Sequence, residues 1–108
     1  MDYLRGTYNV LGTYKAKLGK NKGNPRVWIE GKNLSDFGIV CGMRFNRLVT
    51  GDRISIVFCE HGKSKIAGTK DRPILDLNGK YLNALDTPHF KAEFVVNCAC
   101  TYKNSAQH

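Results

Sequence analysis

One stretch of this chain occurs twice, as KAKLGKNKGNPRVWIEGKNL at residues 15–34 and, 48 positions later, as KSKIAGTKDRPILDLNGKYL at residues 63–82. Aligned without a gap, the two copies are identical at seven of twenty positions, where roughly one identity is expected from average residue usage. The identical pairs are Lys15/Lys63, Lys17/Lys65, Lys22/Lys70, Pro25/Pro73, Gly31/Gly79, Lys32/Lys80 and Leu34/Leu82. Two copies are too few for a solenoid, so the repeat predicts an internal two-fold axis, like a dimer joined in one chain.

Alternating apolar residues on either side of the repeat predict strands. In the first copy, the expected strands cover residues 8–18, 26–30, 43–49 and 53–59. The glycines, lysines and asparagines of residues 19–24 are typical of a loop. Asn33 or Ser35 is expected to cap a one-turn helix that ends at Gly38.

The second copy repeats this order of elements. Its expected strands cover residues 63–67, 73–77, 90–96 and 98–103. Asn78 is a suitable N-cap for a short helix that carries Tyr81, Leu82 and Leu85. One or two residues are missing from this copy in the turn before His89.

The whole chain, residues 1–108, has the length of a single domain. We expect a mainly β, pseudo-two-fold, barrel-like domain of about eight strands and two short helices. The internal repeats cover approximately residues 8–60 and 61–103, and residues 104–108 are expected to form a disordered tail.

The order of elements in the first copy is similar to that of a known family. RVWIEGKNLSDFGIVCGMRF, residues 26–45, reads as strand, short helix, glycine, apolar residue, Gly-Met and strand. It resembles the swapped-hairpin domains of the AbrB, MazE and SpoVT type, bacterial modules that interleave two copies into a small barrel. The matching residues are Arg26, Val27, Ile29, Leu34 and the pair Gly38-Ile39. Glu30-Gly31 stands where that family usually has proline, and the second copy has no Gly-Ile pair.

The resemblance implies DNA binding, because most members of the family are regulators or antitoxins that bind operator DNA. Carried onto this sequence, the basic strand and loop positions are Lys15, Lys17, Lys20, Lys22, Arg26, Lys63, Lys65, Lys70 and Arg72. Matched lysines in two copies suit a two-fold clamp on the phosphates of a duplex. The alternative is that lysines at alternate strand positions mark only the solvent-facing side of each strand.

The net charge favours an anionic partner. Lysine and arginine number 17 against 9 acidic residues, a formal charge of +8, and residues 15–32 hold six bases with Glu30 as the single acid. A basic stripe of this kind is typical of a protein that binds a polyanion. The partner expected is double-stranded DNA or an acidic host protein, and the alternative is a lysine-rich surface that only keeps the chain soluble.

Motifs for catalysis or metal binding are weak. Four potential zinc ligands are Cys59, His61, Cys98 and Cys100, but their one-residue spacings are unusual for zinc. The acidic residues are scattered, and no nucleophile has a histidine and an orienting acid in a suitable arrangement. We therefore expect a protein that is not an enzyme, with no catalytic residue, no metal and no cofactor.

Trp28 is the candidate for contact with a protein. It lies between Val27 and Ile29 and so faces away from them, and its counterpart in the second copy is the polar Asp76. This pattern predicts an exposed tryptophan, a residue favoured at interfaces. The alternative is that Trp28 packs under residues 1–6.

A second hypothesis follows from the same features. Compact, lysine-rich chains without an enzyme motif also resemble small phage accessory proteins, many of which block a host defence such as restriction or phage exclusion. Such a protein would bind a host defence protein, and it would form a homodimer through an exposed strand edge. The sequence has neither a signal peptide nor a membrane-spanning apolar run, so we expect it in the cytoplasm of the bacterial host.

Overall fold

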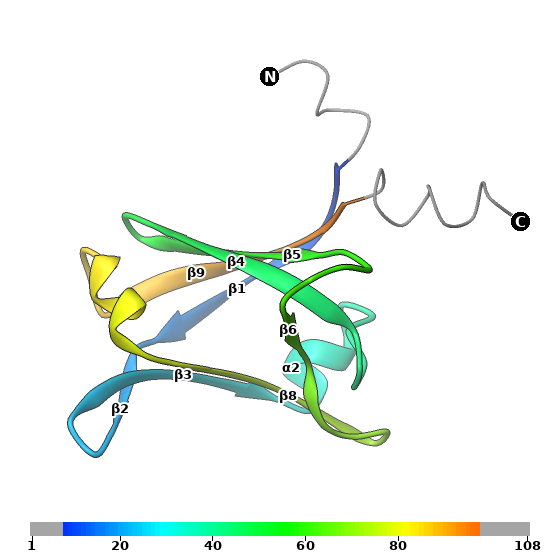
Figure 1. Ribbon diagram of the computed structural model, residues 1–108, viewed down its shortest axis with the longest axis horizontal. Helices are drawn as coiled ribbons and strands as arrows, with labels where there is room; N and C mark the ends of the chain where they lie inside the picture. The colour runs from blue at the N-terminus through cyan, green and yellow to red at the C-terminus, as the bar shows by residue number, and fades with distance from the viewer. Residues whose placement is uncertain (1–7, 98–108) are drawn as a thin grey trace, which may run out of the picture.

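The computed structural model describes residues 8–97, and residues 1–7 and 98–108 lie outside this described part. Two sheets lie one over the other, with the short helices toward opposite ends of the molecule (Figure 1). The five-stranded sheet has the order β1 (Tyr8–Lys17), β9 (His89–Asn97), β5 (Arg53–Phe58), β4 (Arg44–Thr50) and β6 (Ser64–Lys65). The four-stranded sheet has the order β2 (Gly19–Asn21), β3 (Asn24–Glu30), β8 (Arg72–Asn78) and β7 (Ala67–Thr69). The helices are α2 (Lys32–Ser35) and the 3₁₀ helix η1 (Lys80–Ala84).

Alternating apolar residues from both sheets fill the space between them. Strand β3 contributes two buried side chains and β8 three, including Pro73, and β5 and β9 contribute a further series that includes Ile56 and Phe94. Phe94 packs against Phe37 and Phe58, with ring centroids 5.2 and 6.4 Å apart. No polar or charged side chain is buried in the described part of the chain. Apolar burial is therefore the main source of stability of this fold.

The 48-residue spacing of the sequence repeat recurs in the pairing of the four-stranded sheet. In β2 and β3, Gly19 pairs with Arg26 and Asn21 with Asn24. In β7 and β8, Ala67 pairs with Ile74 and Thr69 with Arg72. Every residue of the second set lies 48 positions after its counterpart in the first set. The two outer hairpins of this sheet therefore have the same register.

The two hairpins meet where β3 pairs with β8. This antiparallel ladder runs from Arg26 opposite Asn78 to Glu30 opposite Ile74, with Trp28 opposite Asp76 at its centre. Trp28 and Asp76 are themselves 48 positions apart, so each pairs with its own counterpart in the repeat. Exchanging the two copies leaves every pair of this ladder in register, which places a local two-fold axis between Trp28 and Asp76.

In the five-stranded sheet, the first strand of each copy pairs with the strand that follows the helix of the other copy. Lys17 of β1 pairs with His89 of β9, and Lys65 of β6 pairs with Arg44 of β4. The strands that follow the two helices, β4 and β9, are related by 45 positions rather than 48. The second copy is therefore three residues shorter between its helix and this strand, where a loss of one or two residues was expected. Strand β5 breaks the symmetry, because it runs parallel to β9 and antiparallel to β4.

Several details differ from the sequence-based expectations. The described part of the chain forms two open sheets, and no strand within residues 8–97 belongs to both, so the expected barrel-like closure is not present. Residues 8–97 contain nine strands, because the expected loop at residues 19–24 includes β2 and because the expected strand at residues 63–67 divides at the buried Ile66. The expected strand at residues 98–103 and the tail at residues 104–108 lie outside the described part.

The helices also begin differently from the prediction. The N-cap positions are Gly31 and Gly79, and neither helix has a side-chain cap hydrogen bond, so capping by Asn33, Ser35 or Asn78 is wrong. Gly31 has a φ of 65° and Gly79 a φ of 148°, conformations that glycine adopts without steric cost. The element predicted after β8 is a 3₁₀ helix, so one α-helix is present in residues 8–97. None of the helices described has the length and apolar character that crossing a bilayer requires.

Candidate functional site

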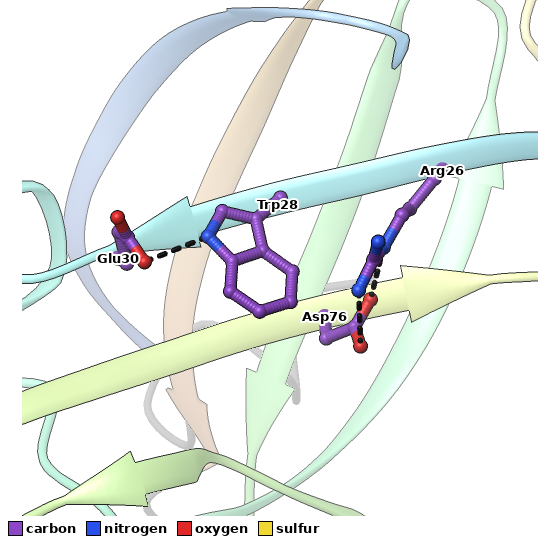
Figure 2. Close-up of polar contacts among 4 residues, drawn as sticks. All are labelled: Arg26, Trp28, Glu30 and Asp76. Atoms are coloured by element: carbon purple, nitrogen blue, oxygen red, sulfur yellow. Dashed lines mark hydrogen bonds and ion pairs between the residues drawn. The ribbon is translucent and has the colours of Figure 1, made fainter. Parts of the chain in front are cut away.

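Trp28 projects from the outer face of the four-stranded sheet. Its neighbours Val27 and Ile29 are buried in the core, whereas Trp28 is 46% exposed. Its indole Nε1 donates a hydrogen bond of 2.7 Å to Glu30 Oε2, and the Arg26 guanidinium carbon lies 4.5 Å from the indole ring centroid (Figure 2). The exposure predicted from the sequence is confirmed, and contacts on both sides hold the ring in one orientation.

Two ion pairs cross from β3 to β8 around this tryptophan. Arg26 donates to Asp76 through Nε at 3.0 Å and through Nη2 at 3.1 Å (Figure 2). Arg72 Nη2 donates to Glu30 Oε1 at 2.5 Å. The hydrogen bond to Asp76 raises the pKa of Arg26, and hydrogen bonds from Arg72 and then from Trp28 lower the pKa of Glu30. The result is a continuous network from Asp76 through Arg26, Trp28 and Glu30 to Arg72.

This network gives the two arginines carboxylate partners that were not predicted from the sequence. Arg26 and Arg72 were predicted to contact phosphate, but each is bound to a carboxylate of the neighbouring strand. A guanidinium that is already paired has less attraction left for a phosphate than a free one. Arg26 also supports the Trp28 ring by a cation–π contact.

The seven predicted lysines differ from the two arginines in their contacts with acidic side chains. All seven are exposed, and no lysine within residues 8–97 forms an ion pair with a carboxylate. They occupy β1, β2 and β6, the residue before β6, and the two hairpin turns: Lys15, Lys17, Lys20, Lys22, Lys63, Lys65 and Lys70. Six of them form the repeat-matched pairs, and Lys20 has Gly68 as its counterpart.

The lysines lie on both sides of the local axis and do not gather in one patch. Lys17 and Lys65 lie on the two edge strands of the five-stranded sheet and at opposite ends of its strands. Their separation across the sheet alone is about 19 Å at the usual spacing of neighbouring strands. Lys22 and Lys70 lie in turns at opposite ends of the β3–β8 ladder, which is roughly 13 Å long at the usual rise per residue.

Two of the predicted lysines come together with Trp28. A shallow hollow of about 340 Å³ is lined by Lys17, Gly19, Lys20, Arg26 and Trp28. Its rim is cationic and its wall is aromatic, an arrangement that favours an anionic partner with an apolar part. The alternative expectation for Trp28, packing under residues 1–6, concerns residues outside the described part.

The contribution of Glu30 and Asp76 to this site was not predicted from the sequence. Arg26, Trp28 and Glu30 are alternate residues of one strand and so share a face, which the sequence already indicated. That Asp76 lies on the same face depends on the register between β3 and β8, which the sequence of either strand does not specify.

No group of three or more His, Cys, Asp or Glu side chains within residues 8–97 is placed to hold a metal ion. Of the four potential zinc ligands, Cys98 and Cys100 lie outside the described part of the chain.

Comparison of the chain with protein-family models, with curated proteins and with solved structures gives no match.

Proposed function

We propose that this protein is a non-enzymatic, basic binding protein, most simply a regulator, that holds double-stranded DNA through lysines on both sides of its local two-fold axis. Duplex DNA has two-fold symmetry at the level of its backbone, and proteins that bind it commonly match that symmetry. The exposed lysines would contact phosphates, and the outer face of the four-stranded sheet around Trp28 would lie between them.

The observation that carries the proposal is the coincidence of two independent features. The strand registers of the two copies are related by the same 48 positions as the lysines Lys15/Lys63, Lys17/Lys65 and Lys22/Lys70. These six side chains are also free of carboxylate partners in residues 8–97, whereas the nearby arginines are paired. Unpaired cations at symmetric positions are available to replace the counterions of a polyanion.

The experiment is a titration of mixed-sequence duplex DNA at about 50 and 200 mM salt, because phosphate contacts give a steep salt dependence. The variant Lys17→Ala/Lys65→Ala removes one matched pair from the edge strands. The control Lys32→Ala/Lys80→Ala removes the same charge from a matched pair at the helix starts. We expect the first variant to bind less tightly and with a lower salt dependence than the control. Equal losses in both would indicate a response to net charge alone.

A protein partner is the second candidate, and the exposed Trp28 favours it. A tryptophan held by a hydrogen bond and a cation–π contact loses little conformational entropy on binding, as expected for an interface anchor. In this hypothesis the protein is a phage-encoded anti-defence factor that binds a host defence protein. Trp28→Ala would then weaken capture of that partner more than the loss of any single lysine would.

A further inference from the structure

A second hollow, separate from Trp28, lies between β4 and η1. It has a volume of about 690 Å³ and is lined by residues 46–49 of β4 together with Lys63, Tyr81 and Ala84. Figure 1 shows η1 at the end of the molecule where β4 passes above it. The size is within the range of pockets that take small organic ligands.

Arg47 is held in place within this hollow by two contacts. Its guanidinium carbon lies 3.8 Å from the centroid of the Tyr81 ring, and its Nη1 donates to Ser64 Oγ at 3.4 Å. One face of the guanidinium is therefore covered by the ring, and its remaining N–H groups are available to a ligand. A planar fork that is fixed before binding loses little entropy when it takes up an anion.

Lys63 is placed beside Arg47 by a backbone contact. The Lys63 backbone N–H donates to Asn46 Oδ1 at 3.0 Å, which leaves the Asn46 amide NH₂ as a further donor. Within the described residues, neither Arg47 nor the Lys63 side chain forms an ion pair with a carboxylate. Among residues 8–97, no acidic residue lines the hollow, so Arg47 and Lys63 face it without an acidic neighbour from this part of the chain.

The remaining lining is apolar or aromatic. Leu48 is 62% exposed, and Val49, Ala84 and the Tyr81 ring complete the wall. Burial raises the pKa of Tyr81, although the charge of Arg47 opposes this effect, so its hydroxyl is a neutral donor at neutral pH. The hollow thus has cationic hydrogen-bond donors at Arg47 and Lys63 and an apolar surface around Leu48.

We propose that this hollow binds a nucleotide, with the phosphate on Arg47 and Lys63 and the planar base on the apolar wall beside Leu48. A phosphate monoester supplies up to two negative charges and three acceptor oxygens, which matches two cations and an amide donor. The base supplies a flat face for the exposed apolar side chains. This site is distinct from the proposed duplex interface and shares only Lys63 with it.

The test is an amide NMR titration of the full chain with adenosine monophosphate, inorganic phosphate and adenosine as separate ligands. We expect adenosine monophosphate to shift the amides of residues 46–49, Lys63 and Tyr81, and to bind about tenfold more tightly than either part alone, because both halves of the site are then occupied. Arg47→Ala should weaken this binding by about tenfold or more, since it removes a charge-assisted contact. Arg53→Gln, which removes an arginine bound to Glu93 on another strand, is the control and should leave it unchanged.

The outcomes separate this proposal from duplex binding. Shifts confined to other residues, or unaltered affinity in Arg47→Ala, would overturn the site. Inorganic phosphate binding as tightly as the nucleotide would overturn the assignment of a base to the apolar wall. For each variant, the amide resonances of residues outside the hollow are first compared with those of the wild type. A variant whose resonances show that it is unfolded is excluded from the comparison of affinities. Arg47→Lys keeps the charge but loses the fork and should give an intermediate affinity.

Discussion

Trp28 and Asp76 pair with each other across β3 and β8, and they occupy the same position in the two copies of the internal repeat. The local two-fold axis therefore passes between an aromatic ring and a carboxylate. This break in the symmetry has a structural use: Asp76 binds Arg26, and Arg26 in turn packs on Trp28 (Figure 2). A second tryptophan at position 76 would leave Arg26 without this partner.

Replacing Asp76 tests whether the sheet face around the axis contacts DNA. Asp76→Asn removes a negative charge from that face and releases Arg26 from its ion pair. We expect tighter duplex binding and a salt dependence steeper by up to about one phosphate contact, measured by anisotropy of a labelled duplex. Asp36→Asn, at the exposed end of α2, makes the same change of charge elsewhere. The same effect from both substitutions would contradict a contact at the Asp76 face.

Glu30 gives the protein a predictable response to acid. Its pKa is lowered by hydrogen bonds from Arg72 and Trp28, so its contribution to stability is fully present above the ordinary glutamate value of 4.5. That contribution is lost as the pH falls through the lower pKa of the folded protein. Because Trp28 is the single tryptophan of the chain, its fluorescence should change in this acidic range. A Glu30→Gln variant should lack the transition, and an unchanged acid titration in this variant would contradict the assignment.

The two copies should contribute similarly to the core. Leu34 and Leu82 are matched in the repeat, and both are fully buried. Leu34→Ala and Leu82→Ala should each lower the free energy of unfolding by about 2–5 kcal/mol, the usual cost of such a cavity. Leu48→Ala, at a position that is 62% exposed, should change it by less than about 0.5 kcal/mol. Denaturant unfolding measures all three, and a large loss in one leucine variant alone would show that the copies are not equivalent.

Much of the fold could be predicted because its central strands alternate clearly. Val27 and Ile29 in β3, and Leu75 and Leu77 in β8, face the core as their spacing indicated. The hairpin of β4 and β5 follows from the same pattern and from its turn at Gly51. The short strands β2 and β7 were missed, because they are rich in Gly, Lys and Thr and gain their order from pairing with β3 and β8.

The remaining features of the fold and of the site depend on pairing between segments that are distant in the sequence, and these pairings could not be predicted. The parallel contact of β5 with β9 joins segments distant in the sequence, and neither strand carries a signal for that register. For the same reason the exposure of Trp28 was predictable from its strand, whereas the ion pairs of Arg26 and Arg72 were not. The helix caps could have been read from the sequence, since Gly31 and Gly79 are an identical pair of the repeat immediately before each helix.

The central claim, a two-fold lysine clamp on a duplex, predicts equal contributions from the two copies. Its most direct test is the slope of log affinity against log salt for the wild type, for Lys15→Ala/Lys17→Ala, for Lys63→Ala/Lys65→Ala and for the fourfold variant. Each double variant should reduce the slope by about two and the fourfold variant by about four, because each phosphate that a lysine no longer neutralises lowers it by roughly 0.9. A reduction confined to one copy, or no duplex binding by the wild type at low salt, would contradict the account.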